Sequence, residues 1–178
     1  MKAFNLIALL VLLFFGSKTT AQEWKNPIIK EYGRIKYYRD AEILPNKHLD
    51  YKIIFDIKDA KEKDGVNKVL WHIARQINLL GAAEIPLKKI HIVAVIHGPA
   101  TSIVLSDNKH QQLYNKHNPN LEILKALTKQ GVKIYVCGQA VAENNIDPYS
   151  EMNPYIHLSL SALITIPNYV LKGYVLMP

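Results

Sequence analysis

Cysteine is almost absent from this sequence, because Cys137 is the only one in 178 residues. One cysteine cannot form a disulfide within the chain, so Cys137 is a free thiol or pairs with another molecule. The chain also has no glycine-rich phosphate motif, which argues against nucleotide binding. It has no Gly-x-Ser-x-Gly sequence either, which argues against a serine hydrolase with a nucleophile elbow.

The histidines do not have the spacing of a metal site. His91 and His97 fall on one face of an expected strand but about 20 Å apart at the usual rise per residue. His110 and His117 are seven residues apart, and no His, Cys and carboxylate cluster has zinc-like spacing. We therefore predict no metal and no cofactor.

Charge of one sign is not concentrated anywhere in the chain. Lysine and arginine number 22 against 15 acidic residues, but they are scattered rather than gathered with aromatic residues into a dense run. Proteins that bind nucleic acid usually concentrate their basic residues on one surface. The pattern predicts a solvated, mildly basic surface and no nucleic-acid partner.

A long hydrophobic run is also missing, although a short one stands at the N-terminus. Lys2 is followed by the ten apolar residues 6–15 and by a small-residue site ending at Ala21, which is typical of a secretory signal peptide. A membrane span needs roughly 20 apolar residues, so we expect no membrane anchor. A lipid anchor would need a cysteine just after this run, and none is there. We predict that residues 1–21 are removed and that the protein is periplasmic or secreted.

The rest of the chain has the size of a single domain preceded by an arm. Residues 22–50 are polar with scattered aromatic residues, are interrupted by Pro27, Gly33 and Pro45, and show no sustained period. They predict an extended arm. From Tyr51 to the end of the chain the pattern is regular, so residues 51–178 form the predicted domain.

Short apolar runs alternate with segments of helical spacing in this domain. Residues 89–96 are almost continuously apolar, which indicates a strand buried on both faces, as in a parallel sheet. Further strands are predicted at residues 51–57, 132–136, 156–160 and 174–177. Helices are predicted at residues 66–80, opened by Asp64-Gly65 and stopped by Gly81, at 118–131, from 138 onward, and at 161–171, where Pro167 fits poorly.

This alternation predicts a three-layer α/β/α sandwich with a mostly parallel sheet of about five strands. Residues 100–112 could form a short helix or a loop, and the strand order is left open.

Chemistry in such a fold collects beyond the carboxyl ends of the strands. Three strand ends carry polar or reactive residues: Asp56 with Asp59, His97-Gly98-Pro99, and Cys137-Gly138-Gln139. If these strands are neighbours, the three groups face one crevice.

Cys137 is the main candidate for a reactive group. A thiol at the start of a helix meets unpaired backbone N–H groups and the positive end of the helix dipole, and both favour the thiolate. A low pKa makes a cysteine nucleophilic near neutral pH, and Gly138 would leave the sulfur open to a partner. The alternative is a buried cysteine that acts only as a small hydrophobic residue.

The other strand-end residues also have two interpretations. His97 could assist proton transfer, because imidazole titrates near neutral pH, but we favour the role of capping a tight turn fixed by Gly98 and Pro99. For Asp56 and Asp59 we favour solvated strand-end carboxylates over the acids of a catalytic pair.

Four stretches together resemble the DsrE/DsrF-like family: YKIIFDI, VAVIHGPA, GVKIYVCGQ and the closing SALITIPNYVLKGYVLMP with its Gly-Tyr pair. The resemblance covers about residues 51–178. It implies a small α/β domain that assembles into trimers, hexamers or mixed complexes. It also implies a cysteine after the third strand that carries sulfur as a persulfide, and by position this cysteine is Cys137.

The residues and the resemblance lead to one main hypothesis and one alternative. The first is an exported thiol protein, sulfurtransferase-like, that accepts and transfers sulfane sulfur on Cys137 and is assisted by His97, Gly98, Gly138 and Gln139. Its expected partners are further copies of itself and a sulfur donor or acceptor protein. The alternative is a non-catalytic oligomeric binding or scaffold domain in which Cys137 is buried and structural.

Overall fold

The computed structural model describes residues 23–178, so the predicted signal peptide at 1–21 lies outside the described residues. A five-stranded parallel sheet forms the centre of this part of the chain, in the order β6-β5-β4-β1-β7. Its strands are β1 Tyr51–Ile57, β4 Ile90–Ile96, β5 Lys133–Cys137, β6 His157–Ser159 and β7 Val175–Met177. The predicted parallel sheet is therefore confirmed.

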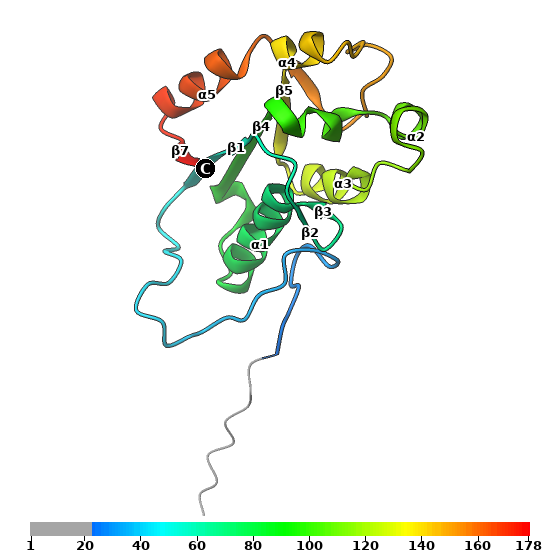
Figure 1. The fold of residues 1–178 in the computed structure, drawn as a ribbon. Helices are drawn as coiled ribbons and strands as arrows, with labels where there is room; N and C mark the ends of the chain where they lie inside the picture. The colour runs from blue at the N-terminus through cyan, green and yellow to red at the C-terminus, as the bar shows by residue number, and fades with distance from the viewer. Residues whose placement is uncertain (1–22) are drawn as a thin grey trace, which may run out of the picture.

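Helices cover both faces of this sheet, as Figure 1 shows. Helices α1 (Lys68–Ala82) and α3 (Leu121–Lys129) pack on one face over the larger hydrophobic core. Helices α4 (Gly138–Glu143) and α5 (Ala162–Leu171) follow the other face, where the core is much smaller and includes Cys137. The three-layer α/β/α architecture is thus confirmed, and the hydrophobic core is larger on the α1 and α3 side of the sheet than on the α4 and α5 side.

The sequence predicted that the Asp64-Gly65 pair opens a helix. In the structure this pair instead forms the turn of a two-stranded hairpin. It connects β2 (Glu62–Lys63) to β3 (Val66–Asn67), and both turn residues have positive φ, at 50° and 80°. A two-residue turn of this kind suits an Asp-Gly pair. Helix α1 begins only at Lys68, after Asn67, whose side-chain oxygen accepts from the backbone N–H of Val69.

Gly81 does not stop α1 either, because the helix continues to Ala82. A Cβ at Gly81 would lie 2.3 Å from Cγ1 of Ile28 in the arm. The glycine therefore allows the arm to pack closely on the helix. The helical spacing of the sequence could not predict this contact, because it joins residues far apart in the chain.

The region left open at residues 100–112 is helical. A 3₁₀ helix, η2 (Gly98–Val104), follows β4 and leads into α2 (Asp107–Tyr114), while a short 3₁₀ turn, η1 (Leu87–Lys89), precedes β4. Two buried amides, those of Asn118 and Asn153, donate to the backbone carbonyl groups of Ile103 and Leu105 at the end of η2. These bonds hold the carboxyl edge of the sheet in place.

Residues 23–50 lie along the domain without a helix or an extended strand, apart from the bridge between Lys25 and Ile35. Asn78, a fully buried residue of α1, attaches this arm. Its side chain accepts from the backbone N–H groups of Ile28 and Ile29 and donates to the carbonyl groups of Ile29, Tyr32 and Gly33.

Within residues 23–178, no helix combines the length and apolar character that crossing a membrane requires.

Candidate functional site

The strand order places the three predicted strand ends next to one another. Strands β1, β4 and β5 are neighbours, so Asp56, His97 and Cys137 all lie at the carboxyl edge of the sheet. Asp56 pairs in register with Val95, and Val95 with Tyr135. His97 and Cys137 come two residues further along their strands, so alternation puts all three side chains on the α5 face.

Cys137 lies where two helices begin. It is the last residue of β5 and the residue before α4, and Ser161 occupies the same position before α5. The backbone N–H groups of Ala162 in α5 and of Ala140 and Gln139 in α4 favour the charged form of the sulfur. Cys137 Sγ also lies 3.8 Å from the Ser161 hydroxyl oxygen.

These donors outweigh the effect of burial on the thiol. Burial raises the pKa of Cys137. The donors lower this pKa by more than burial raises it; they are the backbone N–H groups of Ala162 and Ala140, the Ser161 hydroxyl and the N–H of Gln139. The net result is a pKa below the ordinary value for cysteine, because hydrogen bonds to the charged form favour ionisation. The surroundings of the sulfur therefore support a thiolate.

The thiol is nearly covered by the protein. Cys137 is 6% exposed and packs among Val93, Val95 and Ala162 in the smaller core. One side of the sulfur is thus apolar and the other faces N–H donors. Such a site stabilises a sulfur anion but leaves little of the residue open to a reaction partner.

Gly138 allows the start of α4 to approach the segment after β6 closely. A Cβ at this position would lie 2.8 Å from the carbonyl oxygen of Ser159 and 3.2 Å from that of Leu160. The glycine is required because the segment after β6 passes against the start of α4. Gln139 strengthens this contact, since its side-chain amide donates to the Leu160 carbonyl at 3.1 Å.

His97 pairs with a carboxylate on the neighbouring strand. Its Nε2 lies 2.6 Å from Oδ1 of Asp56, and both side chains are mostly buried. His97 precedes η2, but its side chain makes no capping hydrogen bond there. The imidazole is therefore oriented by Asp56. The turn that we expected His97 to cap is held by its backbone instead, because its carbonyl oxygen accepts from the N–H of Ala100.

The remaining predicted residues serve the turns. Gly98 has a positive φ of 55° and begins η2, and its carbonyl accepts from the Thr101 hydroxyl at 2.6 Å. Asp59 accepts from the backbone N–H of Lys61 at 3.0 Å, in the loop that leads to β2. The Asp59 side chain is 42% exposed and its Oδ2 lies 3.6 Å from Nζ of Lys61, which fits the solvated strand-end carboxylate that we favoured.

Ser161 and Ala162 are the site residues that sequence reasoning missed. Ser161 accepts from the N–H of Leu163 at 3.2 Å and so caps α5. A serine directly before an apolar helical segment is a helix-start signal, so the cap was readable. Its approach to Cys137, 24 residues earlier, was not.

Three tyrosines line the same face beside the thiol: Tyr135, Tyr169 and Tyr174. The Tyr169 hydroxyl donates to that of Tyr135 at 3.2 Å, and the rings of Tyr169 and Tyr174 meet edge to face. Burial raises the pKa of Tyr169 and of Tyr174, so these hydroxyls stay neutral donors.

Among residues 23–178 we find no group of three or more His, Cys, Asp or Glu side chains placed to hold a metal ion.

The fold and the chain match known proteins. The protein of unknown function MTH1491 from Methanobacterium thermoautotrophicum superimposes with a TM-score of 0.56 at 19% identity, covering 72% of this chain and 98% of that one. The ychN protein from E. coli matches with a TM-score of 0.49 at 14% identity, covering 71% and 96%. The comparison with curated proteins gives no match. Because the DsrE/DsrF-like family model matches residues 52–178, this chain belongs to the DsrE/DsrF-like family.

Proposed function

We propose that this protein accepts sulfane sulfur on Cys137, holds it as a persulfide and passes it to an acceptor thiol. The observation that supports this most is the set of N–H donors from the starts of α4 and α5 around the Cys137 sulfur. Donors fixed in advance stabilise an anionic sulfur without reorganising during the reaction. Membership of the DsrE/DsrF-like family, which is associated with sulfur relay, agrees with this chemistry.

The transfer is a pair of thiol exchanges with no net oxidation. The Cys137 thiolate attacks the outer sulfur of a donor persulfide or polysulfide, a new S–S bond forms, and the electron pair of the broken S–S bond leaves with the donor thiolate. An acceptor thiolate then attacks the outer sulfur on Cys137, and Cys137 leaves as a thiolate.

In this proposal His97 carries the proton of the exchange. Its imidazole is oriented by Asp56, and its strand neighbours that of Cys137. The protonated ring gives its proton to the departing donor thiolate and becomes neutral, and it takes a proton back from the acceptor thiol as that thiol becomes the attacking thiolate.

Three measurements test the proposal. Iodoacetamide labelling across pH gives the ionisation of Cys137, and we expect an apparent pKa below the reference of about 8.5. Incubation with polysulfide followed by intact mass measurement should show a gain of one sulfur atom, absent in Cys137→Ser. His97→Gln should keep the labelling pKa and slow the sulfur transfer to an added thiol.

The alternative of a non-catalytic scaffold domain rests on the 6% exposure of Cys137. If the sulfur is inaccessible, iodoacetamide labels it only after denaturation and polysulfide adds no mass to the native protein. That pair of results would leave the scaffold function and reject sulfur transfer.

We also propose that the protein acts outside the cytoplasm, after export, and that it assembles from several copies of this chain. The segment from β6 through β7 exposes nine large apolar side chains, among them Leu163 and Leu171 on α5, each 85% exposed. Exposed apolar patches of this kind mark protein contact sites. Because α4 and α5 border Cys137, a second copy seated on this patch would also enclose the thiol, and a sulfur donor or acceptor protein would reach it at the rim.

A further inference from the structure

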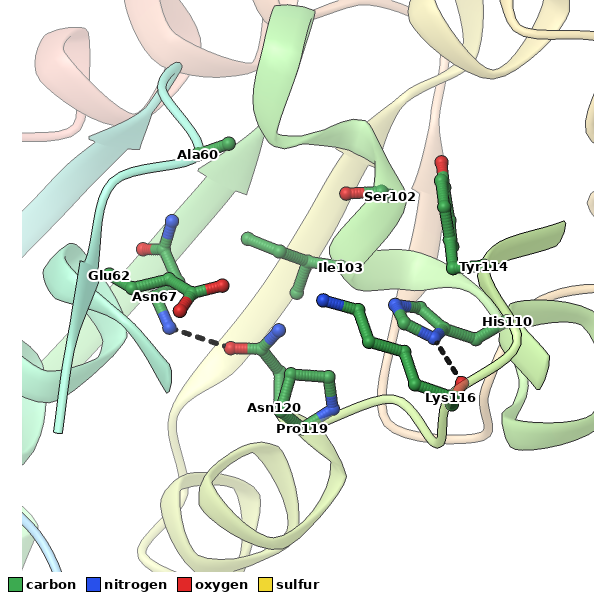
Figure 2. Close-up of a pocket in the computed structure, with 10 residues that line it drawn as sticks. All are labelled: Ala60, Glu62, Asn67, Ser102, Ile103, His110, Tyr114, Lys116, Pro119 and Asn120. Carbon is green, nitrogen blue, oxygen red and sulfur yellow. Dashed lines mark hydrogen bonds between the residues drawn. The ribbon is translucent and has the colours of Figure 1, made fainter. Parts of the chain in front are cut away.

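A second site lies across the sheet from Cys137 and plays no part in the sulfur chemistry. A cavity with a volume of about 150 Å³ lies between the hairpin β2–β3, η2, α2 and the segment that begins α3, and Figure 2 shows residues that line it. Its wall includes Ile103, a residue of the larger core under α1 and α3. At about 30 Å³ per water molecule, the cavity suits a small molecule rather than a nucleotide.

A buried histidine points an unused nitrogen into this cavity. His110 is 5% exposed, and its Nδ1 lies 2.7 Å from the carbonyl oxygen of Lys116. Because a carbonyl oxygen can only accept, this contact assigns the proton to Nδ1 and leaves Nε2 as the acceptor of that tautomer. Nε2 has no hydrogen-bond partner within residues 23–178 and faces the cavity in Figure 2. A buried acceptor without a partner is costly, which points to a ligand that donates to it.

Opposite charges stand on the walls on either side of the cavity. The Glu62 carboxylate comes from β2 and the Lys116 ammonium from the segment after α2, and both reach toward the cavity in Figure 2. Neither side chain forms an ion pair with another described residue. Ser102 and the buried amide of Asn120 add polar groups to the same lining.

We propose that this cavity binds a compact zwitterion of the α-amino-acid class. Its ammonium group would face Glu62, its carboxylate would face Lys116, and an N–H or O–H of the ligand would donate to Nε2 of His110. Both side chains are exposed, so water solvates their charges in the free protein. A simple anion would be repelled by Glu62 and a simple cation by Lys116, whereas a zwitterion can match both. No third His, Cys, Asp or Glu within the described residues joins His110 and Glu62 as a metal ligand.

The test uses the purified protein with ¹⁵N-labelled histidine. Glycine, L-alanine and L-serine are titrated while the Nε2 resonance of His110 is followed, and at least one should shift it saturably with a dissociation constant on the order of 1 mM or below. N-acetyl-L-serine lacks the ammonium group and L-serine methyl ester lacks the carboxylate. Each should bind about tenfold more weakly than L-serine or worse.

Variants separate the site from general charge effects. Glu62→Gln and Lys116→Met should each weaken binding about tenfold. The matched controls Glu42→Gln, in the arm, and Lys88→Met, in η1, remove the same charges elsewhere on the surface and should leave binding unchanged.

Three results would overturn the proposal. The first is the absence of a saturable shift with all three amino acids. The second is binding of sodium sulfate or ethylamine as tight as that of the amino acids, which would make this a site for a single charge. The third is a shift of the His110 resonance by Zn²⁺ alone together with no response to the amino acids.

Discussion

At the scale of single residues, Ser161 links the fold to the reactivity of the thiol. Its hydroxyl oxygen caps α5 by accepting from the N–H of Leu163 and lies 3.8 Å from the Cys137 sulfur. In the thiolate state the hydroxyl proton is free to point at the sulfur. One side chain therefore stabilises both the helix start and the anion.

Ser161→Ala should raise the pKa of Cys137 and lower the free energy of unfolding by about 1 kcal/mol, the usual cost of a lost helix cap. Labelling by iodoacetamide across pH measures the first effect and urea unfolding the second. Ser106→Ala is the matched control, because Ser106 caps α2 through the N–H of Lys109. It should lower stability similarly and leave the labelling pKa unchanged. Equal labelling curves for Ser161→Ala and the wild type would contradict this role.

The lowered pKa of Cys137 also makes stability depend on pH. The folded chain ionises this thiol at lower pH than the unfolded chain does, so ionisation favours folding. The contribution is fully present above the unfolded value of about 8.5 and is lost as pH falls through the folded pKa.

The wild type should therefore gain stability relative to Cys137→Ala as pH rises from about 6 to about 9.5. Urea unfolding of both proteins at the two ends of this range measures the difference. A difference that stays constant across the range would mean that the thiol ionises equally in the folded and unfolded chains.

At the scale of secondary-structure elements, the arm is attached to α1 chiefly through one buried amide. Asn78 makes five hydrogen bonds to the backbone of residues 28–33, and all its polar atoms are satisfied. Gly33 contributes by close approach, since a Cβ there would lie 2.2 Å from the backbone nitrogen of Arg75. The arm is thus part of the domain and adds Ile29 and Ile35 to the buried residues.

Asn78→Ala should lower the free energy of unfolding by about 3 kcal/mol, because several buried backbone groups of the arm lose their partner. Trypsin should then cleave the native protein at Lys30 or Lys36 much faster than it cleaves the wild type. Asn108→Ala, at an exposed position of α2, is the control and should change neither property. Unchanged proteolysis of the arm in Asn78→Ala would show that apolar contacts alone hold it.

At the scale of the whole molecule, the two faces of the sheet differ in how much apolar surface their helices bury. The face under α1 and α3 has a deep core, whereas only Ala162 of α5 is buried on the other face. In Figure 1, α5 and β7 lie at the outside of the molecule, where their apolar side chains meet solvent. A monomer would keep this surface exposed, which is unfavourable in water.

Leu163→Glu combined with Leu171→Glu should convert the oligomer to a monomer, because two charges would be buried in the proposed interface. Light scattering after size-exclusion chromatography measures the change. Leu113→Glu, at an exposed position of α2 away from this patch, is the control and should keep the oligomer. A wild type that is already monomeric at high micromolar concentration would rule out this interface.

Most of the architecture could be predicted from the amino-acid sequence. The continuous apolar run at 89–96 indicated a strand buried on both faces, and the three- and four-residue spacing after Val66 indicated α1. These signals are local, because burial and helical period repeat along a short stretch of chain. The position of Cys137 between a strand and a helix was readable for the same reason.

The contacts between residues far apart in the sequence could not be predicted in this way. The order β5-β4-β1 placed Cys137 and His97 on neighbouring strands, and it paired His97 with Asp56 across 41 residues. The start of α5 came to the sulfur only because β6 pairs with β5. Local periodicity says which face of an element is buried but not what packs against it, so the thiol could be located from sequence while the donors that favour its ionisation could not.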